Sequence, residues 1–145
     1  MTVYPPTILR KYPHMMPNDI AIWERFLVSE HNTFDSFSYD VHVGTGRGYS
    51  DFDPEWKITL AKALTCFRID AVGYHENIAT IIEVKPFAGL SAIGQIIAYS
   101  NLYQINFPDK PVEALLIVTD STSNDVKTVL KANSILLIEV GPSSP

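Results

Sequence analysis

Cysteine, basic residues and long hydrophobic runs are all scarce in this 145-residue chain. The single cysteine, Cys66, excludes an internal disulfide and any zinc site with two or more thiolates. The apolar stretches are short, and the N-terminal residues 1–6 are neither basic nor hydrophobic, so secretion and a membrane-spanning segment are not expected. A cytoplasmic location follows by default.

Positive charge is also scarce, because 11 Lys and Arg stand against 16 Asp and Glu, for a formal net charge of −5. A protein that binds duplex DNA through many phosphates usually has a broad basic surface, and the excess of acidic residues argues against such a surface here. The argument weakens if several of the acids surround a divalent cation, because a bound metal inverts the local field.

The size and composition of the chain are those of one globular domain. Hydrophobic residues make up 46% and charged residues 19%, well away from the composition of disordered chains. Four prolines within residues 1–17 predict an extended lead-in that wraps the domain, and residues 141–145 predict a flexible tail. We therefore expect residues 1–145 to form a single domain.

Hydrophobic periodicity predicts an alternation of helices and strands. Asn18 or Asp19 is the expected N-cap of the first helix. The mixture implies an α/β fold, a central mixed β-sheet flanked by helices. Helices are expected at about 18–29, 54–64, 91–103 and 124–132, and strands at about 37–43, 66–74, 78–87, 112–118 and 135–140.

The second and third predicted strands place two acids opposite each other. If residues 76 and 77 are the central residues of the turn, cross-strand partners have numbers that sum to 153, so Asp70 faces Glu83. Directly opposed side chains have Cβ atoms about 5 Å apart, and two carboxylates at that separation repel unless something lies between them. A hard divalent cation fits that gap.

Two basic residues accompany these acids. Lys85 lies two residues beyond Glu83 and therefore on the same face, and the same register places Arg68 opposite Lys85. The apolar run 78–82 leads directly into Glu83 and Lys85, whose burial as unpaired charges would cost several kcal/mol. The alternative is a solvated hairpin face on which Arg68 pairs with Glu83 and Asp70 with Lys85, at under about 1 kcal/mol per pair.

These residues resemble the signature of the PD-(D/E)XK nuclease superfamily: an acid ending one strand, then an acid, any residue and a lysine on the next. Here the first acid is Asp70, preceded by Ile69 where the motif has proline, and the second group is Glu83-Val84-Lys85. The following helix adds Gln95-Ile-Ile-Ala-Tyr99, which looks like the Gln-x-x-x-Tyr element of the RecB-type branch. The resemblance covers roughly residues 20 to 120.

The resemblance implies a restriction-endonuclease-like core and a nuclease that depends on Mg²⁺ or Mn²⁺. Oxygen ligands suit such hard ions. The metal ligands would be Asp70, Glu83 and the Val84 carbonyl. By the same resemblance, Lys85 would position or deprotonate the attacking water, Gln95 would orient Lys85 or a phosphate, and Tyr99 would support the site.

The family usually also has a glutamate on its first helix. Ile20, Trp23, Glu24 and Leu27 occupy positions i, i+3, i+4 and i+7, which places Glu24 inside the apolar stripe and makes it the candidate for a second metal. Glu30, one turn beyond Leu27, is the second choice. The alternative is that Glu24 sits at the edge of the stripe and reaches water.

Nucleic acid is the partner that the resemblance implies, with DNA expected as substrate, in a prokaryotic cell or a phage-infected host. Arg47, in the glycine-rich segment 44–48, and Arg68 are the candidates for phosphate contacts, although a solvated arginine is the simpler interpretation of Arg47. A homodimer or a larger protein assembly is compatible with the short chain. Two alternatives stay open: a catalytically silent nuclease-like scaffold that binds nucleic acid or protein, and a subunit that is active only in an oligomer.

Overall fold

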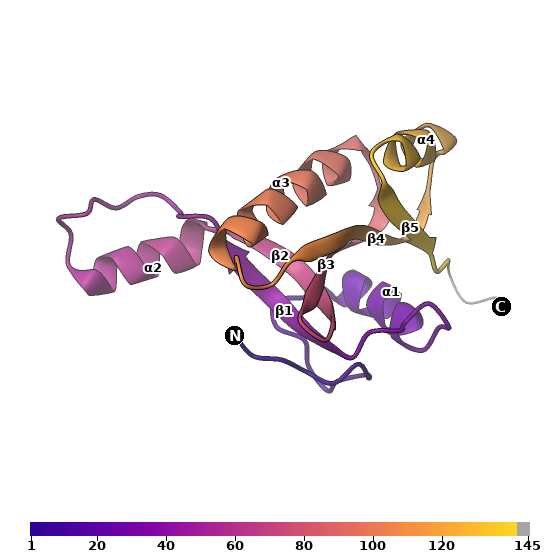
Figure 1. Ribbon diagram of the computed structural model, residues 1–145, viewed down its shortest axis with the longest axis horizontal. Coiled ribbons are helices and arrows are strands. Elements are labelled where there is room, and N and C mark those ends of the chain that lie inside the picture. Colours follow the sequence, from indigo (N-terminus) through magenta and orange to yellow (C-terminus); the bar gives the residue numbers. More distant parts are fainter. Residues whose placement is uncertain (142–145) are drawn as a thin grey trace.

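The computed structural model describes residues 1–141, within which the chain forms four helices and five strands (Figure 1). All the predicted elements are present. β4 extends four residues further than expected. The elements are α1 (Pro17–Leu27), β1 (Ser36–Val43), α2 (Glu55–Thr65), β2 (Phe67–His75), β3 (Ile78–Ala88), α3 (Leu90–Asn106), β4 (Val112–Thr122), α4 (Asn124–Ala132) and β5 (Ile135–Glu139).

The strands form one sheet in the order β1-β2-β3-β4-β5. The first three strands are antiparallel to their neighbours, whereas β3, β4 and β5 run parallel. Parallel neighbours need a crossover connection, and α3 and α4 supply the two that are required here. The predicted α/β fold with a mixed sheet flanked by helices is therefore confirmed.

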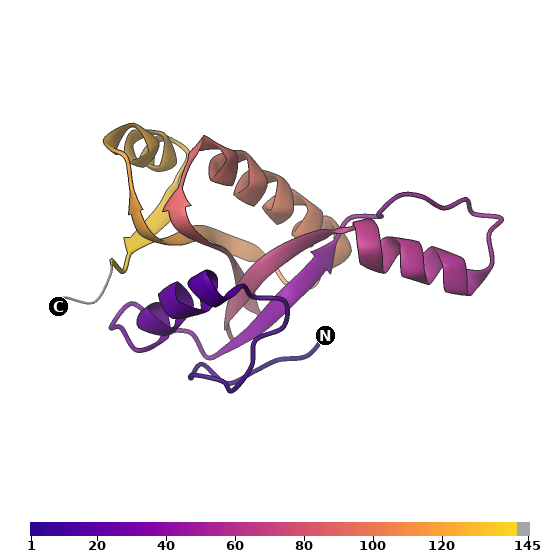
Figure 2. The same cartoon turned by 180° about the vertical axis from the view of Figure 1, so that it is seen from behind.

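Helices cover both faces of this sheet (Figures 1 and 2). Trp23 and Phe26 of α1 are fully buried on one face, together with the aromatic side chains of β1. Ile96 and Tyr103 of α3, with Leu130 of α4, fill the core on the other face. The molecule is thus a three-layer structure in which β3 and β4 are covered on both sides.

The start of α1 differs from the sequence-based expectation. Neither Asn18 nor Asp19 is the N-cap, because the helix begins at Pro17 and Met16 occupies the cap position without a side-chain hydrogen bond. Proline suits the first helical position, where its missing N–H would lack a helical partner anyway. Asp19 therefore lies inside the first turn, where an acid interacts favourably with the helix dipole.

The lead-in, residues 1–16, contacts β1 and the α1 side of the sheet. Tyr4 forms an isolated bridge with Phe37 of β1, with N···O distances of 2.7 and 3.0 Å, and Tyr12 is buried against the α1 side of the sheet. Of the predicted tail, residues 142–145 lie outside the described part of the chain.

The β2–β3 hairpin has the predicted register only up to the point where the two strands separate, which we call the fork. Partners from His75 and Ile78 to Ala71 and Ile82 all sum to 153. Beyond Ala71 and Ile82 the two strands separate, since β2 continues only along β1 and β3 only along β4. Arg68 consequently pairs with His42 of β1, and the expectation that it faces Lys85 is wrong.

The segment 44–66, which we call the arm, projects from one end of the sheet (Figures 1 and 2). It consists of the glycine-containing loop after β1 and the helix α2, which has no buried residue. The hydrophobic core therefore forms without the arm.

The core under α1 generates a prediction about stability. Replacing the buried Phe26 by alanine should lower the free energy of unfolding by about 3–5 kcal/mol, because it leaves a cavity in a packed aromatic cluster. Phe87→Ala, at an exposed position, is the matched control and should cost about 0.5 kcal/mol or less. Urea unfolding followed by circular dichroism measures both, and equal losses would contradict the proposed core.

Candidate active site at the fork of the sheet

Asp70 occupies the gap where β2 and β3 separate. Its Oδ2 accepts a hydrogen bond of 2.9 Å from the backbone N–H of Val84. Because the ladder has ended two residues earlier, this N–H has no strand partner on β2, and the carboxylate takes that place. The fork thus directs the Asp70 side chain toward β3.

Glu83 is almost completely buried on β3. Its neighbours Ile82 and Val84 pack into the core under α1, so the alternation of the strand turns Glu83 toward the opposite side, which α3 covers. Its Oε2 lies 3.7 Å from Nζ of Lys85, whereas its buried Oε1 has no hydrogen-bond partner among residues 1–141. Buried carboxylate oxygens without a partner are rare in folded proteins, and a bound cation would satisfy such an oxygen.

Burial is the main influence on the ionisation of both acids. Burial, followed by the charge of Asp70, raises the pKa of Glu83 to about 8, although the Lys85 ammonium acts in the opposite direction. Burial also raises the pKa of Asp70, against the lowering effect of the Val84 N–H and of Lys85. At neutral pH and without a further cation, the pair therefore holds a shared proton.

Gln95 and Tyr99, the two residues of α3 that the sequence predicted for the site, lie on the side of the helix that faces these acids. Burial raises the pKa of Tyr99, and the charges of Glu83 and Asp70 raise it further. Gln95 lies one turn earlier on the same face of α3, and its buried Oε1 has no hydrogen-bond partner within the described chain. Two unsatisfied side-chain oxygens, one from β3 and one from α3, thus lie on the same side of the sheet.

The acid that α1 brings to the fork is Asp19. Its charge acts on Asp70, and Lys85 acts on it, while burial raises the pKa of Asp19. Glu24 instead accepts a hydrogen bond of 3.2 Å from the Tyr12 hydroxyl and is not among the charges that act on Asp70 or Glu83. Glu30 is exposed.

The sequence contained one signal for Asp19. Pro17 marks the first turn of a helix, and an acid two residues later in that turn lies near the end that α1 presents to the fork. Helical periodicity favoured Glu24 because that criterion selects residues by their angle around the helix. It contains no information on which end of the helix approaches the sheet.

Both arginines expected to contact nucleic acid lie against the last turn of α2. The Arg68 guanidinium donates to the carbonyl of Ala63 at 3.0 Å and lies 3.6 Å from Asp40. The backbone N–H of Arg47 donates to the Thr65 hydroxyl. These arginines are therefore grouped at the base of the arm, next to the first residues of β2.

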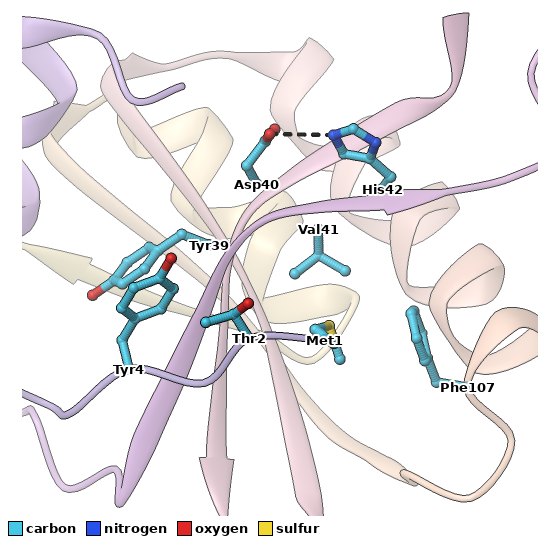
Figure 3. A pocket seen from close by; sticks show the side chains of 8 residues that line it. All are labelled: Met1, Thr2, Tyr4, Tyr39, Asp40, Val41, His42 and Phe107. Carbon is cyan, nitrogen blue, oxygen red and sulfur yellow. Dashed lines mark hydrogen bonds and ion pairs between the residues drawn. The ribbon is translucent and has the colours of Figure 1, made fainter. Parts of the chain in front are cut away.

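A separate pocket of about 330 Å³ lies between the lead-in and β1 (Figure 3). The β1–β2 ladder skips Asp40, which has a φ of +49° and directs its carboxylate to within 3.2 Å of His42 Nε2 and 3.7 Å of His14 Nε2. The residues that line the pocket do not include any of the acids at the fork. They are Met1, Thr2, Tyr4, Tyr39, Asp40, Val41, His42 and Phe107.

The donor set at the fork fits one hard divalent cation that keeps much of its water. No group of three or more His, Cys, Asp or Glu within residues 1–141 could hold a metal ion. Mg²⁺, however, is usually bound through one or two carboxylates with waters completing its shell. Asp70 and Glu83 supply these, and the Val84 carbonyl points toward β2 as its N–H does, because both groups of one residue lie on the same side of a strand.

Comparison of the chain with protein-family models, with curated proteins and with solved structures gave no match. In the described part of the chain, no helix combines the length and the apolar character needed to cross a membrane.

The raised pKa of Glu83 predicts how stability depends on pH. Between the ordinary value of 4.5 and about 8, the folded chain binds a proton that the unfolded chain has lost. The free energy of unfolding should therefore fall as the pH rises through this window. Urea unfolding in EDTA between pH 5 and 8.5 should show a smaller fall for Glu83→Gln than for the wild type.

Glu30→Gln is the matched control for this measurement, because Glu30 is an exposed glutamate. It should retain the wild-type pH dependence. Identical pH dependence in the wild type and Glu83→Gln would contradict the assignment of the buried proton to Glu83.

Proposed function

We propose that this protein is a divalent-metal-dependent nuclease that hydrolyses phosphodiester bonds in DNA and has a restriction-endonuclease-like core. The observation that carries the proposal is the buried Glu83, with one oxygen unsatisfied, next to Asp70 and 3.7 Å from Lys85 in a gap of the sheet. A structural ion pair does not need a second buried acid, since that acid only adds repulsion. A cation between the acids removes the repulsion.

Mg²⁺ or Mn²⁺ would be held by Asp70, Glu83 and the Val84 carbonyl. Such an ion supplies neutralisation of the phosphate charge and a more acidic water. Binding displaces the proton that Glu83 holds near neutral pH, so affinity for the metal is expected to rise with pH.

Lys85 and the two α3 residues would act on the substrate side of the acids. The Lys85 side chain is 35% exposed, so its Nζ reaches both the buried Glu83 and a group that arrives from solvent. It is placed to hold the attacking water and to neutralise the scissile phosphate. Gln95, with its free amide oxygen, orients that water or Lys85, and Tyr99 closes the site next to the acids.

The net charge of −5 is compatible with this function if the cations are concentrated where the substrate runs. Arg47 and Arg68 are the arginines at the base of the arm, near the start of β2, three residues before Asp70, and Arg68 shares its charge with Asp40 at 3.6 Å. Phosphates on one side of the scissile bond would contact these arginines. The acids elsewhere on the surface do not oppose binding at distances beyond about 10 Å in physiological salt.

Cleavage assays test the proposal directly. Labelled single-stranded, duplex and branched DNA should be cut in Mg²⁺ or Mn²⁺ and not in EDTA. Asp70→Asn and Lys85→Met should each lower the rate by about 100-fold or more, because they remove a metal ligand and the group that holds the water.

Asp125→Asn and Lys131→Met are matched controls on α4 and should cut at the wild-type rate. Absence of cutting by folded wild-type protein, over a range of protein concentrations that also covers oligomers, would contradict the proposal. It would favour a nuclease-like scaffold.

A second prediction compares the two acids of α1. Asp19→Asn should lower cleavage about 10- to 100-fold and raise the Mg²⁺ concentration that is required, because Asp19 interacts with Asp70 and Lys85. Glu24→Gln should leave the Mg²⁺ requirement unchanged, since Glu24 is bound to Tyr12. Titration of activity against Mg²⁺ distinguishes them, and the opposite order would show that Glu24 is the acid of the site.

A further inference from the structure

A second pocket lies between α3 and the base of the arm. The helix α3 extends from the end of β3 toward the arm (Figures 1 and 2), and Asn106 at its C-terminal end accepts a hydrogen bond of 2.8 Å from the backbone N–H of Gly44. The pocket between these elements, which we call the arm-base pocket, has a volume of about 270 Å³. Its lining includes residues 44–47 of the loop after β1, together with Thr65, Phe67 and Leu102.

One aromatic pair connects the arm-base pocket to the acids of the fork. The centre of the Phe67 ring lies 5.8 Å from the centre of the Tyr99 ring. Burial raises the pKa of Tyr99, and the charges of Glu83 and Asp70 raise it further, so Tyr99 lies beside both acids. Along β2, Phe67 is three residues from Asp70, or about 10 Å. A polymer whose reacting unit is at the acids therefore reaches the pocket with a neighbouring unit.

The chemistry of the pocket suits a flat ring that carries a phosphate nearby. The Phe67 side chain is 52% exposed, so a face of its ring is open to a ligand although it packs on Tyr99. The guanidinium of Arg47 forms no ion pair with any acid of residues 1–141. Aromatic rings and arginine are the groups on which the bases of single strands stack.

A double helix matches these features poorly. Proteins bind a duplex chiefly through many phosphates on a broad basic surface, whereas this chain has a formal net charge of −5. Arg68, the other arginine at the base of the arm, lies 3.6 Å from Asp40. The bases of a duplex are also stacked on one another, so none is free to enter a pocket with an aromatic wall. An apolar protein segment is disfavoured because it would bury Arg47 without a partner.

We propose that the arm-base pocket binds an unpaired base of single-stranded DNA, which stacks on Phe67 while Arg47 contacts the adjoining phosphate. The proposal rests on the nuclease function proposed above and names its substrate class. With the scissile phosphate at Asp70 and Glu83, the base of a neighbouring nucleotide lies on Phe67. Single-stranded DNA is therefore the preferred substrate.

The first experiment measures binding without cleavage. Fluorescence anisotropy in EDTA compares the affinity of the full chain for a labelled thymidine oligonucleotide of about 12 nucleotides with its affinity for a duplex of the same length. The wild type should bind the single strand about tenfold more tightly than the duplex. An oligonucleotide of the same length built from stable abasic nucleotides should bind as weakly as the duplex, because it offers phosphates but no ring.

Two substitutions at one position separate stacking from apolar packing. Phe67→Leu keeps an apolar side chain next to Tyr99 but removes the aromatic face, so it should weaken binding of the single strand about tenfold. Phe67→Tyr retains the ring and should bind as the wild type does. Phe52→Ala is the matched control, at a 98% exposed phenylalanine on the N-terminal side of α2, and should also bind normally. Thermal unfolding of each variant checks that the fold is intact.

The failure of the base-binding site and the failure of the nuclease function give different results. No binding of the single strand, equal affinity for the single strand and the abasic chain, or unchanged affinity in Phe67→Leu would overturn the site even if the protein cuts DNA in Mg²⁺. Binding of the single strand that depends on Phe67, without any cutting, would support the site and contradict the nuclease. If the protein cuts DNA, Phe67→Leu should raise KM for single-stranded DNA about tenfold and leave kcat unchanged.

Discussion

The repulsion between two buried carboxyl groups is the constraint on which the centre of this structure depends. Asp70 and Glu83 lie on neighbouring strands, and burial alone would raise the pKa of each. A continuous ladder would hold them opposite each other with only side-chain contacts available. Separation of β2 from β3 after Ala71 and Ile82 gives the Asp70 carboxylate a backbone N–H to accept from, so the fork stabilises the acids that the sheet brings together.

The gap between β2 and β3 also lets charged groups on the two faces of the sheet interact. β2 remains with β1 on the antiparallel side, and β3 remains with β4 on the parallel side. Between them, the charge of Asp19 on α1 acts on Asp70 from one face, and the charges of Glu83 and Asp70 raise the pKa of Tyr99 on α3 at the other. A sheet without a gap would have kept these charges on opposite sides of a layer of backbone.

The elements that could be predicted from the sequence were those with strong local patterns. Alternation along β1, the apolar run of β4 and the capped segment of α4 identified these elements, and the spacing of Glu83 and Lys85 placed their side chains together. The turn at residues 76 and 77 defined the register of the hairpin. The prediction for Arg68 was wrong because a register deduced from a turn assumes that the two strands stay paired. Here β2 leaves β3 after Ala71 and stays paired with β1 alone.

The choice between Asp19 and Glu24 required a different kind of information. Periodicity describes the orientation of a residue around the helix axis, but the distance of each helix end from the fork depends on how α1 crosses the sheet. That crossing is determined by tertiary packing, including the burial of Trp23 and Phe26 and the ion pair between Arg25 and Asp120. The helix α2 was predicted from its sequence, yet that none of its residues is buried becomes evident only in the fold.

The bridge between Tyr4 and Phe37 has a consequence for the edge of the sheet. β1 is a terminal strand of eight residues, and its outer N–H and C=O groups are able to pair with any extended chain that reaches them. The lead-in occupies part of that edge through two backbone hydrogen bonds. The lead-in therefore shields this part of the edge from pairing with another chain, while its Tyr4 side chain packs against the core under α1.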